Sequence, residues 1–272
     1  MANLLLEVDK LSRFFPKEGK GRGFWRKTES VAVVKQVSFS MHEGEILALL
    51  GESGCGKSTI AKMLLGLLKP TEGSIFYQGK EVSGLSDAAY RPYRREIQMI
   101  FQNPFSGLDA RKNIRSQLLE PLRVWKIGAN HAERMERIEE ICQDCGLPKS
   151  CLEKMPAEFS GGQLQRIAIA RALLLSPKFL VADEIVSALD VPIQNQILDL
   201  LQKMQQKYGL TVLFITHDIA VAKHISDRMM LMRSGEVLGI GKYEDLLQRS
   251  EESGNYLREL QKASFVFGKA VL

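Results

Sequence analysis

Residues 51–59 read Gly51-Glu52-Ser53-Gly54-Cys55-Gly56-Lys57-Ser58-Thr59 and fit the pattern G-x-x-x-x-G-K-S/T of a phosphate-binding loop. The apolar run at 45–50 that precedes them predicts a β-strand, and residues 60–65 that follow predict a helix. Glycines allow the backbone N–H groups to turn inward around an anion, and the helix N-terminus adds the positive end of its dipole. The flanking strand and helix therefore turn a pattern match into a structural prediction.

Two side chains of this loop have a predicted chemical role. We expect Lys57 to reach the β- and γ-phosphates and Ser58 to offer its hydroxyl to Mg²⁺. The alternative is a glycine turn that only opens a helix, but such a turn needs neither the lysine nor the serine. The sequence therefore predicts a nucleoside triphosphate site. The residues predicted to bind the nucleotide here are Gly51, Ser53, Gly54, Cys55, Gly56, Lys57, Ser58 and Thr59.

The composition is that of a globular chain, with 272 residues and 45% hydrophobic content. Helix-like and strand-like segments alternate along it, which favours an α/β fold with a largely parallel sheet. No apolar run approaches the roughly 20 residues that cross a bilayer, and the N-terminus lacks the layout of a signal peptide, so we expect a cytoplasmic location. A net charge of +5 suits nucleic acid, anionic lipid or nucleotide phosphates and does not decide among them.

Cys142 and Cys145 form a C-x-x-C pair, which invites a metal or redox interpretation. A second such pair and a nearby histidine, which would complete a tetrahedral metal site, are missing from the sequence. Met135, Ile138, Cys142 and Cys145 also recur at the spacing of one helix face. The pattern therefore predicts core thiols, which pack as small hydrophobic side chains.

The N-terminal part of the chain predicts a hairpin. Residues 4–9 and 31–41 have the alternation of an antiparallel strand pair, and the glycine-rich, basic segment 16–30 predicts an exposed loop between them. That loop is solvated or contacts lipid headgroups or a partner. Phe14 and Phe15 precede it, and an aromatic side chain there can either stack on a purine ring or belong to the core.

Four polar residues follow apolar, strand-like runs and supply candidate catalytic groups. Gln102 and His217 each stand at the exit of such a run, where a side chain can face a bound ligand. Asp183 is suited to bind Mg²⁺, and Glu184 is suited to act as a general base that polarises the attacking water. His217 could hydrogen-bond the γ-phosphate. The alternatives are mere surface charge for the two acids and a structural role for His217.

Ser160-Gly161-Gly162-Gln163 stands directly before a strongly helical segment at 164–175. Ser160 can cap that helix, and the paired glycines would let a ligand approach its positive N-terminus. A capped helix without a ligand is the alternative. Because the chain has one phosphate loop, a second helix end suited to phosphate suggests that it serves the nucleotide of another subunit.

The order of these motifs resembles the ATP-binding subunits of ABC transporters, over residues 4 to about 245. After the phosphate loop the matching motifs are Gln102, Ser160-Gly161-Gly162-Gln163, Asp183-Glu184, Ser187-Ala188-Leu189-Asp190 and His217. The resemblance implies an α/β P-loop NTPase fold with a RecA-like core, an antiparallel β subdomain and an inserted α-helical subdomain. The implied nucleotide-binding domain would span residues 1–245, with its core at 1–102 and 172–245 and its helical subdomain at 103–171. A C-terminal helical tail would span residues 246–272.

The resemblance also implies that two subunits dock head to tail around two ATPs, each phosphate loop facing the partner's Ser160–Gln163 signature. Gln102 would sense Mg²⁺ and the attacking water, Asp190 would signal across the dimer, and Phe15 would stack on adenine. The implied cofactors are ATP and Mg²⁺. The implied catalytic residues are Glu184, His217, Gln102 and Lys57, and the implied metal-binding residues are Ser58, Gln102 and Asp183.

Within the superfamily the chain is similar to the importer branch for peptides and nickel, on the stretches 98–104, 162–166 and 213–218. It departs from that branch at Phe159, where Leu is commoner, at Ile185, where Pro is frequent, and at Ser253-Gly254-Asn255-Tyr256, where a His-Pro-Tyr element is usual. The short tail is closer to the nickel and metallophore members.

The sequence thus predicts an ATPase that powers uptake of peptides or of nickel and metal chelates. Its expected partners are a similar but non-identical ATPase subunit, two transmembrane permease subunits and, indirectly, an extracytoplasmic solute-binding protein, without nucleic acid. It would sit peripherally on the cytoplasmic face of the cell membrane. The alternatives are a soluble ABC ATPase that acts on DNA or ribosomes, and a regulatory subunit that binds ATP without turnover.

Overall fold

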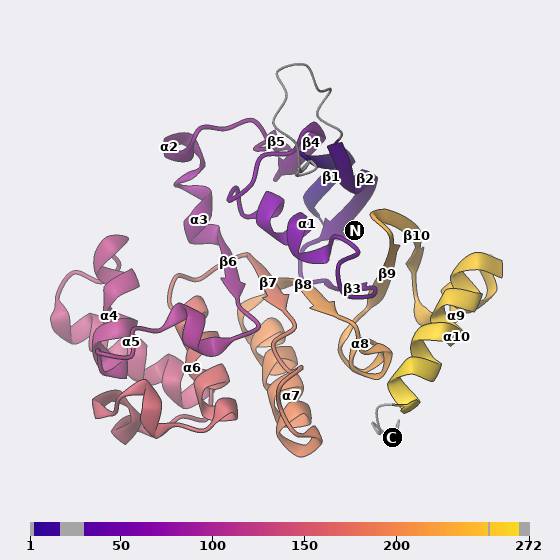
Figure 1. Cartoon of the computed structure of the whole chain (residues 1–272). Helices are drawn as coiled ribbons and strands as arrows, with labels where there is room; N and C mark the ends of the chain where they lie inside the picture. The colour runs from indigo at the N-terminus through magenta and orange to yellow at the C-terminus, as the bar shows by residue number, and fades with distance from the viewer. Residues whose placement is uncertain (1–2, 17–29, 250, 267–272) are drawn as a thin grey trace, which may run out of the picture.

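The computed structural model describes residues 3–16, 30–249 and 251–266, and within them the chain forms two sheets with helices around them (Figure 1). The larger sheet has six strands. Its members, in spatial order, are β10 (Glu236–Gly241), β9 (Arg228–Arg233), β3 (Ile46–Leu50), β8 (Thr211–Thr216), β7 (Phe179–Asp183) and β6 (Ile97–Ile100). All neighbouring pairs are parallel except β9 and β10, which form an antiparallel hairpin at the edge.

The central strands β3 and β8 are largely apolar, with threonine only at the two ends of β8, because both faces of the sheet are covered. Every residue of β3 and β8 is buried. Successive side chains point to opposite faces, so Leu180 of β7 joins the core on one side and Val181 joins the core on the other. The strand ends that carry the candidate catalytic residues are therefore held by a sheet packed on two sides.

The smaller sheet is antiparallel and contains the predicted N-terminal hairpin. Its order is β2 (Ser30–His42), β1 (Leu4–Pro16), β4 (Glu72–Tyr77) and β5 (Lys80–Glu81). β1 runs beyond the predicted 4–9, and register shifts such as that between Val8 and Leu11 accommodate its extra length. Residues 17–29, which make up most of the predicted basic loop, lie outside the described residues.

Helices cover both faces of the large sheet and form a group at one end of the molecule (Figure 1). Two, α9 and α10, lie at the opposite side, near the C-terminus. The elements are α1 (Lys57–Leu64), α2 (Asp87–Tyr90), α3 (Tyr93–Glu96), α4 (Ile114–Val124), α5 (His131–Asp144), α6 (Gly161–Leu173), α7 (Val191–Tyr208), α8 (Ile219–Ile225), α9 (Tyr243–Arg249), α10 (Glu251–Val266) and the 3₁₀ turns η1 (Pro104–Gly107), η2 (Lys149–Glu153) and η3 (Pro156–Glu158).

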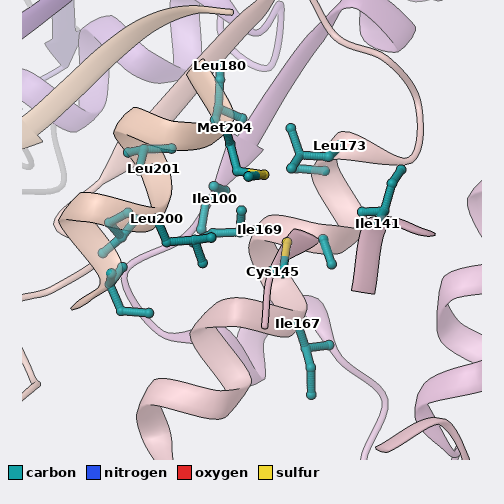
Figure 2. Close-up of a cluster of buried hydrophobic side chains, with 14 of the residues drawn as sticks. Ile100, Ile141, Cys145, Ile167, Ile169, Leu173, Leu180, Leu200, Leu201 and Met204 are labelled. Atoms are coloured by element: carbon teal, nitrogen blue, oxygen red, sulfur yellow. The ribbon is translucent and has the colours of Figure 1, made fainter. Parts of the chain in front are cut away.

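The grouped helices α4, α5 and α6 share one apolar core with α7 and one face of the sheet. Figure 2 shows Cys145, directly after α5, Ile169 of α6 and Met204 of α7 within this cluster. All four cysteines of the chain are free and buried, which confirms the core position that the helical spacing predicted for Cys142 and Cys145. Among the described residues, His, Cys, Asp and Glu side chains form no group of three or more that could hold a metal ion.

In the part of the chain that the structure describes, none of the helices combines the length and the apolar composition that a bilayer span requires.

Helix α4 offers a test of this core. Leu118 is fully buried and Val124, on the same helix, is 57% exposed. We expect Leu118→Ala to lower the free energy of unfolding by about 2–5 kcal/mol, because it leaves a cavity between packed helices. Urea titration followed by circular dichroism measures the change. Val124→Ala should cost no more than about 0.5 kcal/mol, and equal losses in the two variants would contradict the assigned burial.

Candidate nucleotide site

The phosphate-binding loop lies between β3 and α1, and its backbone is one that glycine favours. Gly54 has φ +83° and Gly56 has φ +111°, both in the left-handed region. A Cβ on Gly56 would lie 2.6 Å from the carbonyl oxygen of Val33, so a side chain has no room there. Helix α1 begins at the next residue, Lys57, and its N-terminus therefore faces the hollow of the loop.

The loop holds the Lys57 ammonium at its centre. Lys57 is buried, and its Nζ donates to the carbonyl oxygens of Gly51 at 2.6 Å and Glu52 at 2.8 Å. A buried charge needs such partners, because leaving it unsolvated and unpaired is costly. The contacts place a positive charge beside the helix N-terminus, where the phosphates of a nucleotide would lie.

Glu184 is contacted on both carboxylate oxygens by the two other candidate catalytic residues. Gln102 donates its Nε2–H to Oε2 at 3.0 Å, and Nδ1 of His217 lies 3.4 Å from Oε1. These residues come from the exits of β6, β7 and β8, far apart in sequence. The structure thus brings Gln102, Glu184 and His217 into one cluster, which fixes the orientation of a carboxylate able to accept a proton.

The backbone of Glu184 is strained, with φ +48° in a residue other than glycine. Two hydrogen bonds hold it: its N–H donates to the carbonyl of Ile215 at 2.9 Å, and its carbonyl accepts from Oγ of Ser187 at 2.9 Å. This turn directs the side chain away from the strand and toward Gln102. Ile185, which follows, is buried, so the position that is often proline in similar importers here contributes to the core.

Asp183 and Ser58 supply oxygen donors of the kind that Mg²⁺ prefers. The pKa of Asp183 is raised above its usual value, because the effect of burial outweighs the hydrogen bond with Ser58 and the nearby charge of Lys57, which both act to lower it. A half-buried carboxylate whose anionic form is disfavoured gains from a divalent cation, and a hydroxyl and a carboxylate side by side fit Mg²⁺. Bound there, Mg²⁺ would neutralise charge on the phosphates.

A pocket of about 430 Å³ opens over these groups. Of the predicted residues it brings together Ser53, Gly54, Gly56, Lys57, Ser58, Thr59, Gln102 and Glu184. It also includes Val33 of β2, which the sequence pattern did not single out because an apolar residue within a strand carries no chemical signal. As far as the chain is described, Phe15, Asp190 and the segment 160–163 are not among its lining residues.

The remaining predicted residues have contacts of their own. The guanidinium of Arg13 lies 4.7 Å from the ring centre of Phe15, and Asp190 stands at the start of α7 without a side-chain capping bond. Ser160 and Gln163 cap α6 reciprocally, so this helix begins earlier than the predicted residue 164. A Cβ on Gly162 would lie 2.5 Å from a methyl of Ile193, so that glycine allows α6 to pack on α7.

A phosphate-binding loop, a Mg²⁺-type donor pair and an oriented carboxylate at the ends of parallel strands define a nucleotide-hydrolysing protein of the P-loop class.

Comparison with known proteins narrows this class. The sequence profile of the ABC transporter family matches residues 34–187. The oligopeptide transport ATP-binding protein OppF of Escherichia coli K12 is 44% identical over 244 residues, which cover 89% of this chain and 73% of that protein. The oligopeptide transport ATP-binding protein AppF of Bacillus subtilis 168 is 45% identical over 243 residues, which cover 88% of this chain and 73% of that protein. A solved dimer of the ATP-binding cassette MJ0796, in a post-hydrolysis state with ADP and Pi, superposes with a TM-score of 0.76 at 31% identity, covering 88% of this chain and 98% of that one.

The chain therefore belongs to the ABC transporter family. It is an ATPase that uses ATP with Mg²⁺, and its α/β P-loop NTPase fold is confirmed by its structural neighbours. The individual roles of the site residues stay predictions.

Lys57 provides the test of the nucleotide site. We expect Lys57→Ala to weaken ATP binding by about tenfold or more, because it removes the charge-assisted hydrogen bonds available to the phosphates. Isothermal titration calorimetry with MgATP measures the change. The control is Lys62→Ala, on the exposed side of α1, which removes the same charge from the same helix. Equal losses in the two variants would contradict a specific role for Lys57.

Proposed function

We propose that this chain is the ATP-hydrolysing subunit of an ABC importer for peptides. The observation that carries the proposal is the 44% identity to a protein named for oligopeptide transport over nearly nine-tenths of the chain. The similarity to AppF of Bacillus subtilis supports the same substrate class. Nickel and metal chelates, which the sequence also predicts, are the second substrate class.

In the proposed mechanism Glu184 accepts the proton of the attacking water. Its carboxylate is suited to this role because Gln102 and His217 hold its two oxygens, as described above. Lys57 binds the phosphates, and Ser58 and Asp183 hold Mg²⁺, with Gln102 sensing both the metal and the water. Phe15 would contribute stacking on adenine.

The site of one chain is incomplete in this proposal, and a second ATPase subunit completes it. The phosphate loop of one subunit would face Ser160–Gln163 of its partner, with Asp190 signalling across the interface. The exposure of Ser160, Gly161 and Gln163 at the N-terminus of α6 supports this arrangement, because these residues are free to meet a partner. A similar but non-identical partner subunit is the expected arrangement.

A groove between the sheet and the grouped helices is the proposed docking surface for a permease. It has a volume of about 220 Å³ and is lined by residues of β6, η1, α4 and α6. Phe101, which lines the groove, and Phe105, which follows the lining residue Pro104 in η1, are 44% and 50% exposed, and aromatic side chains of this kind anchor protein interfaces. Segment 103–112 joins Gln102 to α4, so movement there would couple the nucleotide site to two permease subunits at the cytoplasmic face of the membrane. We also propose the division into a core at 1–102 and 172–245 and a helical subdomain at 103–171.

The general base is testable in the chain together with its partner subunit, because one chain alone supplies only part of the site in this proposal. Glu184→Gln should bind MgATP as the unchanged chain does but hydrolyse it at least about 100-fold more slowly, because the amide cannot accept the proton. Phosphate release and calorimetry measure the two properties, and Glu244→Gln, an exposed acid on α9, is the control. ATP should also hold the Glu184→Gln chain, with its partner subunit, as a dimer in size-exclusion chromatography. Near-normal hydrolysis by this variant would refute the assignment.

Uptake measurements distinguish the substrate classes. Cells that lack this chain should lose uptake of a labelled tripeptide and regain it with the unchanged chain but not with Glu184→Gln. Uptake of radioactive nickel serves as the second readout. Loss of nickel uptake with unchanged peptide uptake would refute the peptide proposal and favour the nickel and metal-chelate class.

A further inference from the structure

The C-terminal helix α10 reaches the phosphate-binding loop from behind. Tyr256 of α10 is fully buried and packs in one cluster with Leu50, the residue directly before the loop, and with Leu246 of α9. Gly254 permits this approach, since a Cβ there would lie 2.8 Å from the carbonyl oxygen of Leu247. The tail is thus packed against the strand that carries the loop.

The hydroxyl of Tyr256 makes two hydrogen bonds with main-chain groups. It accepts the N–H of Glu52 at 3.2 Å and donates to the carbonyl oxygen of Met232 at 3.2 Å. Burial raises the pKa of Tyr256, so the hydroxyl keeps its proton and can donate at neutral pH. Through one accepted and one donated hydrogen bond, the Tyr256 hydroxyl therefore links α10 to the loop and to β9.

The Glu52 N–H and the Gly51 carbonyl belong to the same peptide group. That carbonyl accepts from Nζ of Lys57 at 2.6 Å, so a single peptide plane connects Tyr256 on one side with Lys57 on the other. Rotation of this plane would turn an N–H toward the ammonium in place of an oxygen, and like partial charges would then meet. Whatever fixes the plane also fixes the position of the Lys57 ammonium.

We propose that Tyr256 is a positioning residue of the ATP site: its hydroxyl holds the Gly51–Glu52 peptide in the orientation that directs Lys57 to the phosphates. Tyr256 does not touch the nucleotide, and its effect passes through the loop. The ring is held mainly by its apolar neighbours. The guanidinium of Arg233, 5.1 Å from the ring centre, and its ion pair with Glu259 at 3.8 Å add little, because both charged side chains are about half exposed.

The test is Tyr256→Phe in the full chain, which keeps the ring and removes the hydroxyl. Its Kd for MgATP and for ADP, measured by calorimetry, should rise by about 3- to 10-fold, since a buried N–H and a buried carbonyl lose their partner. ATP should lose at least as much affinity as ADP, because Lys57 is expected to reach the β-phosphate that both nucleotides carry and the γ-phosphate that only ATP carries. At saturating ATP, kcat should stay within about twofold, because Glu184 and its neighbours are unchanged.

Tyr77→Phe is the matched control. Tyr77 is equally buried, and its hydroxyl donates to Glu96 at 3.1 Å, away from the loop. An unchanged Kd in Tyr256→Phe, the same rise in both variants, or a fall in kcat alone would overturn the proposal.

Amide hydrogen exchange of the unchanged chain gives a test that does not depend on the folding of a variant. The Glu52 N–H should exchange as slowly as the amides of β3, and in Tyr256→Phe its exchange should be at least about tenfold faster. Rapid exchange of the Glu52 amide in the unchanged chain would overturn the proposal.

The proposed role of Tyr256 rests on ATP binding by the chain, and failure of the one is distinguishable from failure of the other. If the unchanged chain binds no ATP, the assignment of the ATP site is wrong. Normal ATP binding with no effect of Tyr256→Phe refutes only the role of Tyr256.

Discussion

The parallel pairing of β3, β8, β7 and β6 is the constraint on which the site depends. Its register sets Leu50 opposite Thr216, Asp183 opposite Ile215, and Ile100 opposite Ala182, so all four strands end at the same edge. The phosphate loop, His217, the two acids and Gln102 follow those ends and must therefore meet. Because both faces of the two central strands are buried, a slip of one residue in register would place their side chains in the core on the wrong side of the sheet, and the geometry of the site is protected by the packing of the two cores.

A second constraint is the burial of a cation inside a tight loop. The carbonyls of Gly51 and Glu52 accept hydrogen bonds from the buried Lys57 ammonium, and the Tyr256 hydroxyl outside the loop in turn holds the Gly51–Glu52 peptide. The β9–β10 turn also holds the loop, where the N–H of Gly235 donates to the carbonyl of Cys55 at 3.1 Å. A loop held in this way meets the phosphates without first having to rearrange, which is the arrangement that favours binding and charge stabilisation.

Local sequence patterns were sufficient for much of this organisation. They predicted the strand–loop–helix unit around Lys57, the N-terminal hairpin of β1 and β2 and the core position of Cys145, because each depends on residues close together in the chain. They also identified Gln102 and Glu184, since a polar residue after an apolar run marks a strand end. They could not give the positive φ of Glu184, which the packing of Ile185 and a bond from Ser187 impose, or the early start of α6, which depends on reciprocal capping.

The contact between the tail and the loop shows why the rest escaped sequence analysis. Glu52 and Tyr256 are 204 residues apart, and an apolar or aromatic residue in a helix predicts burial without naming what it packs against. The segment Ser253–Tyr256 stood out only as a departure from the pattern of similar importers, yet its small residues are what its place in the fold requires: Ser253 is buried, and Gly254 lies against the backbone of α9. A bulkier pair would move α10 outward and draw the Tyr256 hydroxyl away from the peptide that it bonds. In this chain the departure is therefore a condition for the contact, and the nucleotide loop is shaped by residues at the opposite end of the sequence from those that bind the phosphates.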